Sequence, residues 1–135
     1  MTLTRRSMMI LGSASLLLAG RAAHASYVDY TPGLVTDRLA AGETLFVDFY
    51  APWCGTCRTQ ERHIEALRDE NPAYDQAMSF IRVDWDTHGT GALAQSLNIP
   101  RRSTLVLLRG EQELGRIVAG TSRADIQALM NLGLS

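Results

Sequence analysis

Leu45-Phe46-Val47-Asp48-Phe49-Tyr50, followed after Ala51-Pro52 by Trp53-Cys54-Gly55-Thr56-Cys57, is the stretch that decides the fold of this chain. Its first six residues are mostly apolar or aromatic, which is typical of a buried strand. The two cysteines are the only ones among 135 residues, and they lie three positions apart. A strand that runs into Cys-x-x-Cys and continues as a helix places the first thiol near the helix N-terminus, where unpaired N–H groups favour a thiolate. Because thiolates attack disulfides, we interpret the two cysteines as a redox pair.

Other interpretations of the two cysteines fit the sequence less well. A zinc site needs two more Cys or His ligands at suitable spacing, and His24, His63 and His88 form no ligand pair. A structural disulfide that closes so short a loop constrains little of the unfolded chain. Two inert buried thiols do not explain the strand and helix patterns on either side. We therefore expect no bound metal and no dissociable cofactor, because the pair itself stores the electrons.

Residues 1–25 have the features of an export signal. The paired arginines Arg5-Arg6 precede an apolar run, and Ala23-His24-Ala25 fits a small-x-small cleavage site. The run Met8–Gly20 has 13 residues, fewer than the ~20 that a membrane-spanning helix needs. The arginine pair resembles a twin-arginine signal, although many Sec signals also carry two arginines. We expect export to the periplasm, with an uncleaved N-terminal anchor as the alternative.

Residues 26–135 have the length of one compact domain. The whole chain has a formal net charge of −1, and all of its 13 basic residues are arginine. Without the three arginines of the leader, ten basic residues remain against 14 acidic ones, a net charge near −4. This balance offers no basic excess for nucleic acid or anionic lipid. A monomeric domain without a nucleic-acid partner is expected.

The order of apolar patterns predicts alternating helices and strands. Helices are expected over Pro32–Ala41, Cys57–Glu70, Gly91–Leu97 and Ser122–Leu132, and strands over Thr44–Tyr50, Met78–Trp85, Thr104–Leu108 and Leu114–Ala119. Gly42 and Asn71-Pro72 are stop signals, and Ser122 is an N-cap. The last two strands form a hairpin. The sequence therefore predicts an α/β fold with helices on both faces of a mixed central sheet.

Val47–Arg58 resembles the active-site segment of the thioredoxin family, and the resemblance extends over residues 26–135. Gly120 falls where that family carries a glycine after its last strand. Asp48–Cys54 and the long helix after Cys57 are most similar to exported, reductase-type members such as the C-terminal domain of DsbD-type electron transporters. The resemblance implies the thioredoxin fold and thiol–disulfide exchange with proteins.

The resemblance also implies a role for each polar residue of the motif. Cys54, as the more exposed thiol, would attack the partner disulfide, and Cys57 would resolve the mixed disulfide. Asp48 would be a buried carboxylate that shuttles a proton for Cys57, since a charge inside an apolar strand is costly unless it has a use. The alternative is an aspartate at an exposed strand end. Arg82 on the neighbouring strand would keep Asp48 ionised if the two side chains pair; otherwise it is solvated.

Four further residues are expected to contact partners around the thiols: Trp53, Gly55, Thr56 and Arg102. The alternative for Trp53 is simple packing, and the alternative for Arg102 is a side chain that points into water. Thr56 replaces a proline that cytosolic thioredoxins commonly carry, which leaves the direction of electron flow open.

Ser103 is a departure from the family, which places a cis-proline immediately before its penultimate strand. Pro100 lies three residues earlier and would take that role only in a shifted register. Because a cis bond before a non-proline residue costs about 2.5–4 kcal/mol, we expect Arg102-Ser103 to be trans. The loop should then differ in shape, with Ser103 facing partners and with Arg101 and Arg102 favouring the thiolate and attracting acidic partners.

The sequence thus predicts a periplasmic thiol–disulfide oxidoreductase, more specifically a reductase of protein disulfides. A reductase in an oxidising compartment needs an electron source, and the resemblance implies a membrane donor of the DsbD or CcdA type. An oxidase or isomerase of the same fold is one alternative. A non-catalytic module that binds a metal or cluster through both thiols is the other.

Overall fold

The computed structural model of the chain describes residues 26–135, so the export signal expected over residues 1–25 lies outside the described residues. The strands are β1 Val28–Asp29, β2 Thr44–Tyr50, β3 Ser79–Asp84, β4 Thr104–Arg109 and β5 Gln112–Val118. The helices are α1 Leu34–Ala40, α2 Gly55–Glu70, α3 Ala73–Ala77, α4 Trp85–His88, α5 Ala92–Ser96 and α6 Arg123–Leu132. Each helix and strand expected from the sequence is present, and its ends agree with the expected ones to within two residues. The short elements β1, α3 and α4 were not expected.

The five strands form one mixed sheet in the order β1-β3-β2-β4-β5. β3 runs parallel to β1 and β2, whereas β4 is antiparallel to β2 and to β5. β2 lies at the centre, and its residues from Thr44 to Phe49 are all buried. In this register Asp48 is opposite Arg82 of β3 and Leu105 of β4. The predicted α/β architecture is confirmed.

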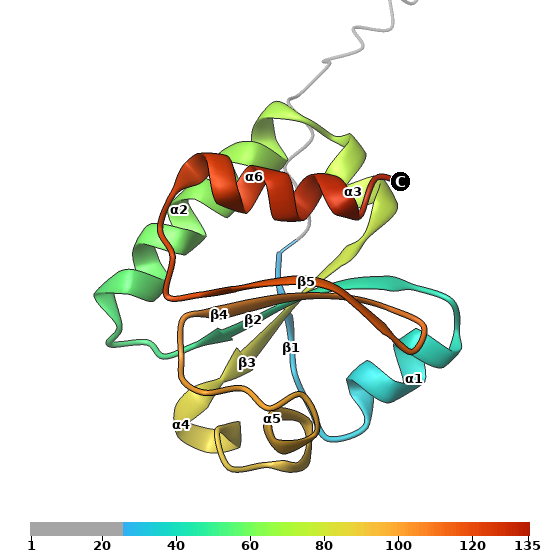
Figure 1. Ribbon diagram of the computed structural model, residues 1–135, viewed down its shortest axis with the longest axis vertical. Helices are drawn as coiled ribbons and strands as arrows, with labels where there is room; N and C mark the ends of the chain where they lie inside the picture. Colours follow the sequence, from blue (N-terminus) through green and yellow to red (C-terminus); the bar gives the residue numbers. More distant parts are fainter. Residues whose placement is uncertain (1–25) are drawn as a thin grey trace, which may run out of the picture.

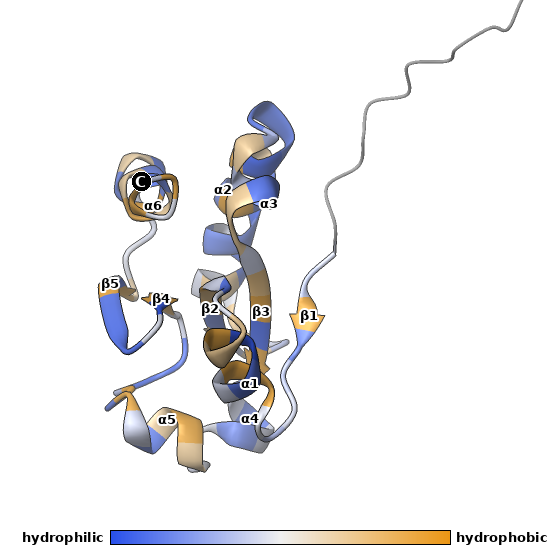
Figure 2. Cartoon of the chain, turned by 90° about the vertical axis from the view of Figure 1, so that its right-hand side faces the viewer, coloured by the Kyte–Doolittle hydropathy of each residue, from blue (hydrophilic) through white to orange (hydrophobic). Residues whose placement is uncertain are grey.

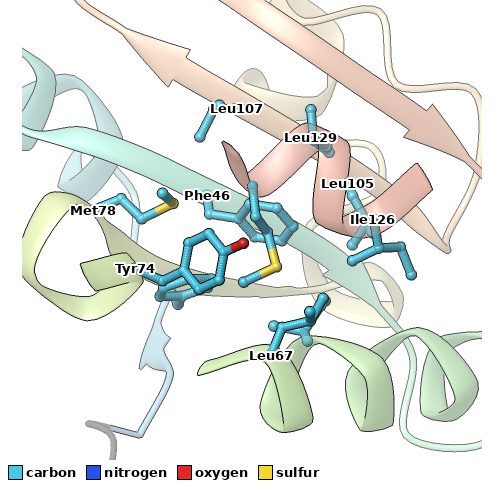
Figure 3. Close-up of a cluster of buried hydrophobic side chains, with 11 residues drawn as sticks. Phe46, Leu67, Tyr74, Met78, Leu105, Leu107, Ile126 and Leu129 are labelled. Atoms are coloured by element: carbon cyan, nitrogen blue, oxygen red, sulfur yellow. The ribbon is translucent and has the colours of Figure 1, made fainter. Parts of the chain in front are cut away.

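Side chains that alternate along β2 supply a separate hydrophobic core to each face of the sheet, as the two-residue period of a strand requires. Phe46 packs with residues of α2, α3 and α6, whereas Leu45, Val47 and Phe49 pack with residues of α1 and α5. Figure 1 shows α2, α3 and α6 on one side of the sheet and α1, α4 and α5 on the other. The side view of Figure 2 separates the same two helical layers. Figure 3 shows the first core, where Phe46 lies among side chains of the sheet and α6.

Local signals in the sequence explain where the helices begin and end. Gly42, just after α1, has φ +87, a left-handed conformation that glycine adopts without strain. The Ser122 Oγ accepts a hydrogen bond from the Asp125 N–H at 3.3 Å and so caps α6. Within residues 26–135 the helices are too short or too polar for any of them to cross a membrane.

Candidate active site

The two cysteines lie where β2 passes into α2. Cys54 is the N-cap of α2 with an extended backbone (φ −87, ψ 114), and its Sγ accepts a hydrogen bond from the Cys57 N–H at 3.2 Å. Both thiols are free in this structure. An N-cap position faces the unpaired N–H groups of the first helical turn, which stabilise negative charge. The geometry therefore places the Cys54 sulfur where a thiolate is favoured.

The environment separates the pKa values of the two thiols. Burial raises the pKa of Cys54, but hydrogen bonds from Cys57, Ser103 and Arg102 outweigh it and lower that pKa from 9.0 to about 7. Burial and the hydrogen bond to Cys54 raise the pKa of Cys57 above its usual value. Both residues are 3% exposed, so surface exposure does not single out Cys54 as the attacking thiol. Electrostatics and hydrogen bonding, rather than access, distinguish the two sulfurs.

Ser103 lies against both sulfurs. Its Oγ is 3.2 Å from the Cys54 Sγ and 3.0 Å from the Cys57 Sγ. The residue is 0% exposed, so its expected role as a partner contact does not fit: the side chain points inward to the thiols. No peptide bond within residues 26–135 is cis, as expected for Arg102-Ser103, and the exposed Pro100 does not take the place of Ser103.

The backbone of Ser103 is held in an uncommon conformation. Its φ of +63 is in the left-handed region, which costs a residue with a Cβ about 1 kcal/mol or more. The Ser103 N–H donates to the Phe49 carbonyl at 2.7 Å, and its carbonyl accepts from the Ala119 N–H at 2.9 Å. These bonds tie the loop before β4 to the end of β2, beside the thiols.

Gln60 completes this arrangement, and sequence reasoning missed it. It is 0% exposed on α2, and its Nε2 donates to the Ser103 carbonyl at 3.0 Å and to the Gly120 carbonyl at 2.9 Å. The available signal was an amide on the apolar face of the helix, four residues before Ile64. A buried amide needs partners, and here it joins α2 to the loops on either side of the β4–β5 hairpin.

Asp48 is buried beneath α2, on the same face of β2 as Phe46. It is 1% exposed, so the alternative of an exposed strand end was wrong. Its Oδ1 has no hydrogen-bond partner. Burial, together with the negative charges of Glu61 and of Cys54, raises the pKa of Asp48 from 3.8 to about 8 despite the opposing charge of Arg82. Asp48 can therefore hold or release a proton near neutral pH.

Arg82 lies opposite Asp48 in the sheet but forms its ion pairs elsewhere. Its guanidinium is 3.7 Å from an Asp29 oxygen and 3.8 Å from a Glu61 oxygen, and it lies 4.5 Å from the centroid of the Tyr50 ring. Its charge lowers the pKa of Asp48, but burial prevails. The pairing with Asp48 that the sequence left open is therefore not formed, because the Arg82 guanidinium pairs with Asp29 and Glu61 instead.

Trp53, which precedes Cys54 in the chain, has an exposed side chain. It is 56% exposed, its Nε1 donates to the Asp86 Oδ2 at 2.9 Å, and the Arg102 guanidinium lies 4.3 Å from its ring centroid. Asp86, on α4, is a contact that sequence reasoning missed. Gly55 is exposed and Thr56 half-buried at the first turn of α2, where the expected partner contacts with both stay a prediction.

Comparison with known proteins identifies the family. The thioredoxin family model matches residues 34–132. The chain belongs to the thioredoxin family. Mitochondrial thioredoxin-2 of Schizosaccharomyces pombe is 38% identical over 95 residues, which are 70% of this chain and 64% of that protein. Thioredoxin-1 of Saccharomyces cerevisiae is 31% identical over 91 residues, 67% of this chain and 82% of that protein. The crystal structure of Trxlp from Edwardsiella tarda has a TM-score of 0.66 and 33% identity, covering 77% of this chain and 98% of that one.

Thioredoxins are thiol–disulfide oxidoreductases that act on protein disulfides, so the expected fold and enzyme class are confirmed. The active-site segment of this chain places the Cys54 and Cys57 thiols together at the N-terminus of α2. The narrower resemblance to DsbD-type domains, the periplasmic location and the role of each residue stay predictions. Within residues 26–135, no three His, Cys, Asp or Glu side chains are grouped so that they could hold a metal ion.

Proposed function

We propose that this thioredoxin is an exported reductase of protein disulfides. The observation that carries the proposal is the Cys54 sulfur at the N-terminus of α2, with a pKa of about 7 that leaves close to half of it as thiolate at neutral pH. The raised pKa of Cys57 keeps the second thiol protonated while Cys54 attacks the partner disulfide. One nucleophile and one reserve thiol are the two groups that a dithiol exchange requires.

The proposed reaction has two steps. The Cys54 thiolate attacks one sulfur of a partner disulfide; a mixed disulfide forms, and the other partner sulfur leaves as a thiolate that takes a proton from water. In the mixed disulfide Cys54 carries no charge and no longer raises the pKa of Asp48, so more of this carboxyl is ionised. The ionised Asp48 takes the proton of Cys57, and Cys57 attacks the Cys54 Sγ. The bond between Cys54 and the partner breaks, the partner leaves with both sulfurs reduced, and Cys54 and Cys57 are oxidised to a disulfide.

The pKa of Cys54 favours a reductase over an oxidase. Strongly oxidising members of this fold stabilise the thiolate much further, with a pKa of about 3.5 in DsbA, whereas thioredoxin has about 7. Stabilising the thiolate stabilises the reduced protein and makes the pair more oxidising. With a pKa of about 7, Cys54 lies close to the reductase end of this range.

Residues 1–25 support export. The S. pombe relative is named a mitochondrial protein, but a mitochondrial leader is amphipathic and rich in arginine, whereas Met8–Gly20 is an uncharged, largely apolar run before a small-x-small site. In an oxidising periplasm the pair would be re-reduced by a membrane donor of the DsbD or CcdA type, and the protein would act as a monomer.

Three measurements test this proposal. The purified protein should reduce insulin with dithiothreitol as the electron source, and Cys54→Ser should abolish the turnover while Cys57→Ser should accumulate mixed disulfides. Equilibration with glutathione should give a potential near that of thioredoxin, about −270 mV; a value near −120 mV, that of DsbA, would instead make it an oxidase. Residues 1–25 fused to a reporter that folds only in the periplasm should give signal there, and a cytoplasmic reporter would contradict export.

A further inference from the structure

The Ser103 hydroxyl occupies a position from which it can reach either sulfur of the pair. It is 3.2 Å from the Cys54 Sγ and 3.0 Å from the Cys57 Sγ, both within hydrogen-bonding range for sulfur. A hydroxyl carries one hydrogen to donate and can accept as well, and it rotates freely to suit its surroundings. When one sulfur is a thiolate and the other a thiol, the hydroxyl can donate to the first and accept from the second.

We propose that Ser103 is a catalytic residue whose single hydroxyl hydrogen follows the negative charge, binding the Cys54 sulfur during attack and the Cys57 sulfur during product release. The inference deepens the proposed function, because it rests on the roles given to the two thiols. It replaces the partner-contact role expected for Ser103 from the sequence.

Each step needs only a rotation of the Ser103 hydroxyl. Before attack, the hydroxyl donates to the Cys54 thiolate, which also accepts from the Cys57 S–H. Once Cys54 is bonded to the partner sulfur it carries no charge, so the hydroxyl is released. As Cys57 gives its proton to Asp48, the hydroxyl turns to donate to the new Cys57 thiolate, which attacks Cys54 and expels the partner thiolate. Ser103 itself gains and loses no proton and no electrons.

The protein holds this hydroxyl firmly in place. Ser103 is 0% exposed, so water does not compete for its hydroxyl. Its left-handed backbone is fixed by bonds to Phe49 and Ala119, and the Gln60 amide holds its carbonyl from the side of α2. Gln60 thereby acts as a positioning residue: it touches neither sulfur and acts through Ser103.

The test compares Ser103→Ala and Ser103→Gly in the purified protein. Both variants lack the hydroxyl, but they act oppositely on the backbone, because glycine relaxes a φ of +63 and alanine does not. Ser96→Ala, on α5 with its hydroxyl bonded to the Leu93 carbonyl, is the matched control. The other ionisable groups near Cys54 stay unchanged: Cys57 on α2, Asp48 on β2 and Arg102 before β4.

The signature is a pH profile that crosses that of the unmodified protein. Losing a hydrogen bond to the thiolate should lower the acid dissociation constant of the Cys54 thiol about tenfold. The thiolate fraction at pH 7 then falls about fivefold. Because the thiolate of a less acidic thiol is about threefold more nucleophilic, attack on a small disulfide slows only about twofold. Above pH 9 both proteins are mostly ionised, and the variants should react about two- to threefold faster than the unmodified protein.

Stopped-flow attack on oxidised glutathione from pH 5 to 10, with the Cys54 thiolate followed by its ultraviolet absorbance, measures both effects. The proposal is supported if the profiles of the alanine and glycine variants match each other and both cross the profile of the unmodified protein. Profiles that coincide with that of the unmodified protein, or that differ between alanine and glycine, overturn it, because the effect would then be absent or would come from loop shape.

Product release is tested in the same variants. Acid-quenched samples analysed by mass spectrometry should show the mixed disulfide on Cys54 persisting about tenfold longer without the hydroxyl, since one hydrogen bond to the Cys57 thiolate is lost. An unchanged lifetime overturns the second half of the proposal, in which the hydroxyl turns to Cys57.

A double-variant comparison tests Gln60. Gln60→Leu should shift the Cys54 profile in the same direction as Ser103→Ala, and in the Ser103→Ala background it should shift it no further, although each variant lowers stability separately. Additive shifts of the profile would mean that Gln60 acts independently of Ser103 and would overturn its positioning role. Cys54→Ser distinguishes the two proposals: if it retains turnover the proposed function fails, whereas Ser103→Ala should slow turnover and shift its pH dependence without abolishing it.

Discussion

Replacing Asp48 with asparagine should stabilise the reduced protein by an amount that grows with pH. Burial and nearby negative charge raise the pKa of Asp48 to about 8, whereas in the unfolded chain the same carboxyl ionises near pH 4. Between these values the folded protein keeps a proton that the unfolded chain has lost, so stability falls as pH rises. The fall is ~1.4 kcal/mol per pH unit and up to ~6 kcal/mol across the window. Asparagine has nearly the same shape and does not titrate.

Urea unfolding of the reduced protein and of Asp48→Asn at pH 4, 6, 7 and 8.5 measures this difference. At pH 4 the two proteins should differ by a small amount set by packing alone. At pH 7 the variant should be more stable by roughly 3–4 kcal/mol relative to that baseline, and the gain should level off above pH 8. A gain that is constant with pH, or that shrinks as pH rises, would refute a neutral buried carboxyl and would mean that Asp48 has a stabilising partner in the folded state.

Three other substitutions have distinct expected effects. Arg102→Gln removes a hydrogen bond that lowers the pKa of Cys54, so alkylation of Cys54 by iodoacetamide at pH 7 should slow severalfold while the rate at pH 10 stays within about twofold. Asp86→Ala frees the Trp53 indole, so KM for a protein disulfide should rise severalfold, whereas an altered alkylation rate would show that Asp86 acts on the thiol instead. Ser122→Ala removes the N-cap of α6 and should cost about 1 kcal/mol in thermal or urea unfolding, with an unchanged midpoint arguing that the cap contributes nothing.

The fold was predictable from the sequence because strong local signals agreed with one another. The apolar run of β2, the glycine after α1 and the cap of α6 each mark an element without reference to the rest of the chain. The short elements were not predictable in this way. β1 has two residues and exists only because β3 offers it an edge, with Val28 opposite Ile81, so its formation depends on tertiary contact.

At the site, the positions that depend on adjacent residues in the chain were predictable, and the contacts that depend on tertiary packing were not. Cys54 at a helix N-terminus and Asp48 inside a strand can be expected from adjacent residues. The side chain of Arg82 could have pointed to Asp48 equally well by sequence, yet it pairs with Asp29 and Glu61. The contact between Gln60 and the loop at Ser103 joins residues 43 positions apart, and no local sequence pattern predicts this partner.

Ser103 shows why a departure from a family pattern has to be interpreted through its contacts. Replacing a proline with serine gains a backbone N–H and a hydroxyl, and both are used: the N–H bonds to Phe49, and the hydroxyl meets both sulfurs. The left-handed backbone costs about 1 kcal/mol or more, and such strain persists only where surrounding contacts enforce it. If the loop merely filled space, a glycine or a relaxed conformation would serve better. The strained backbone directs the hydroxyl to the thiols, so the position of the hydroxyl accounts for the strain, and removing the hydroxyl should change the reactivity of Cys54.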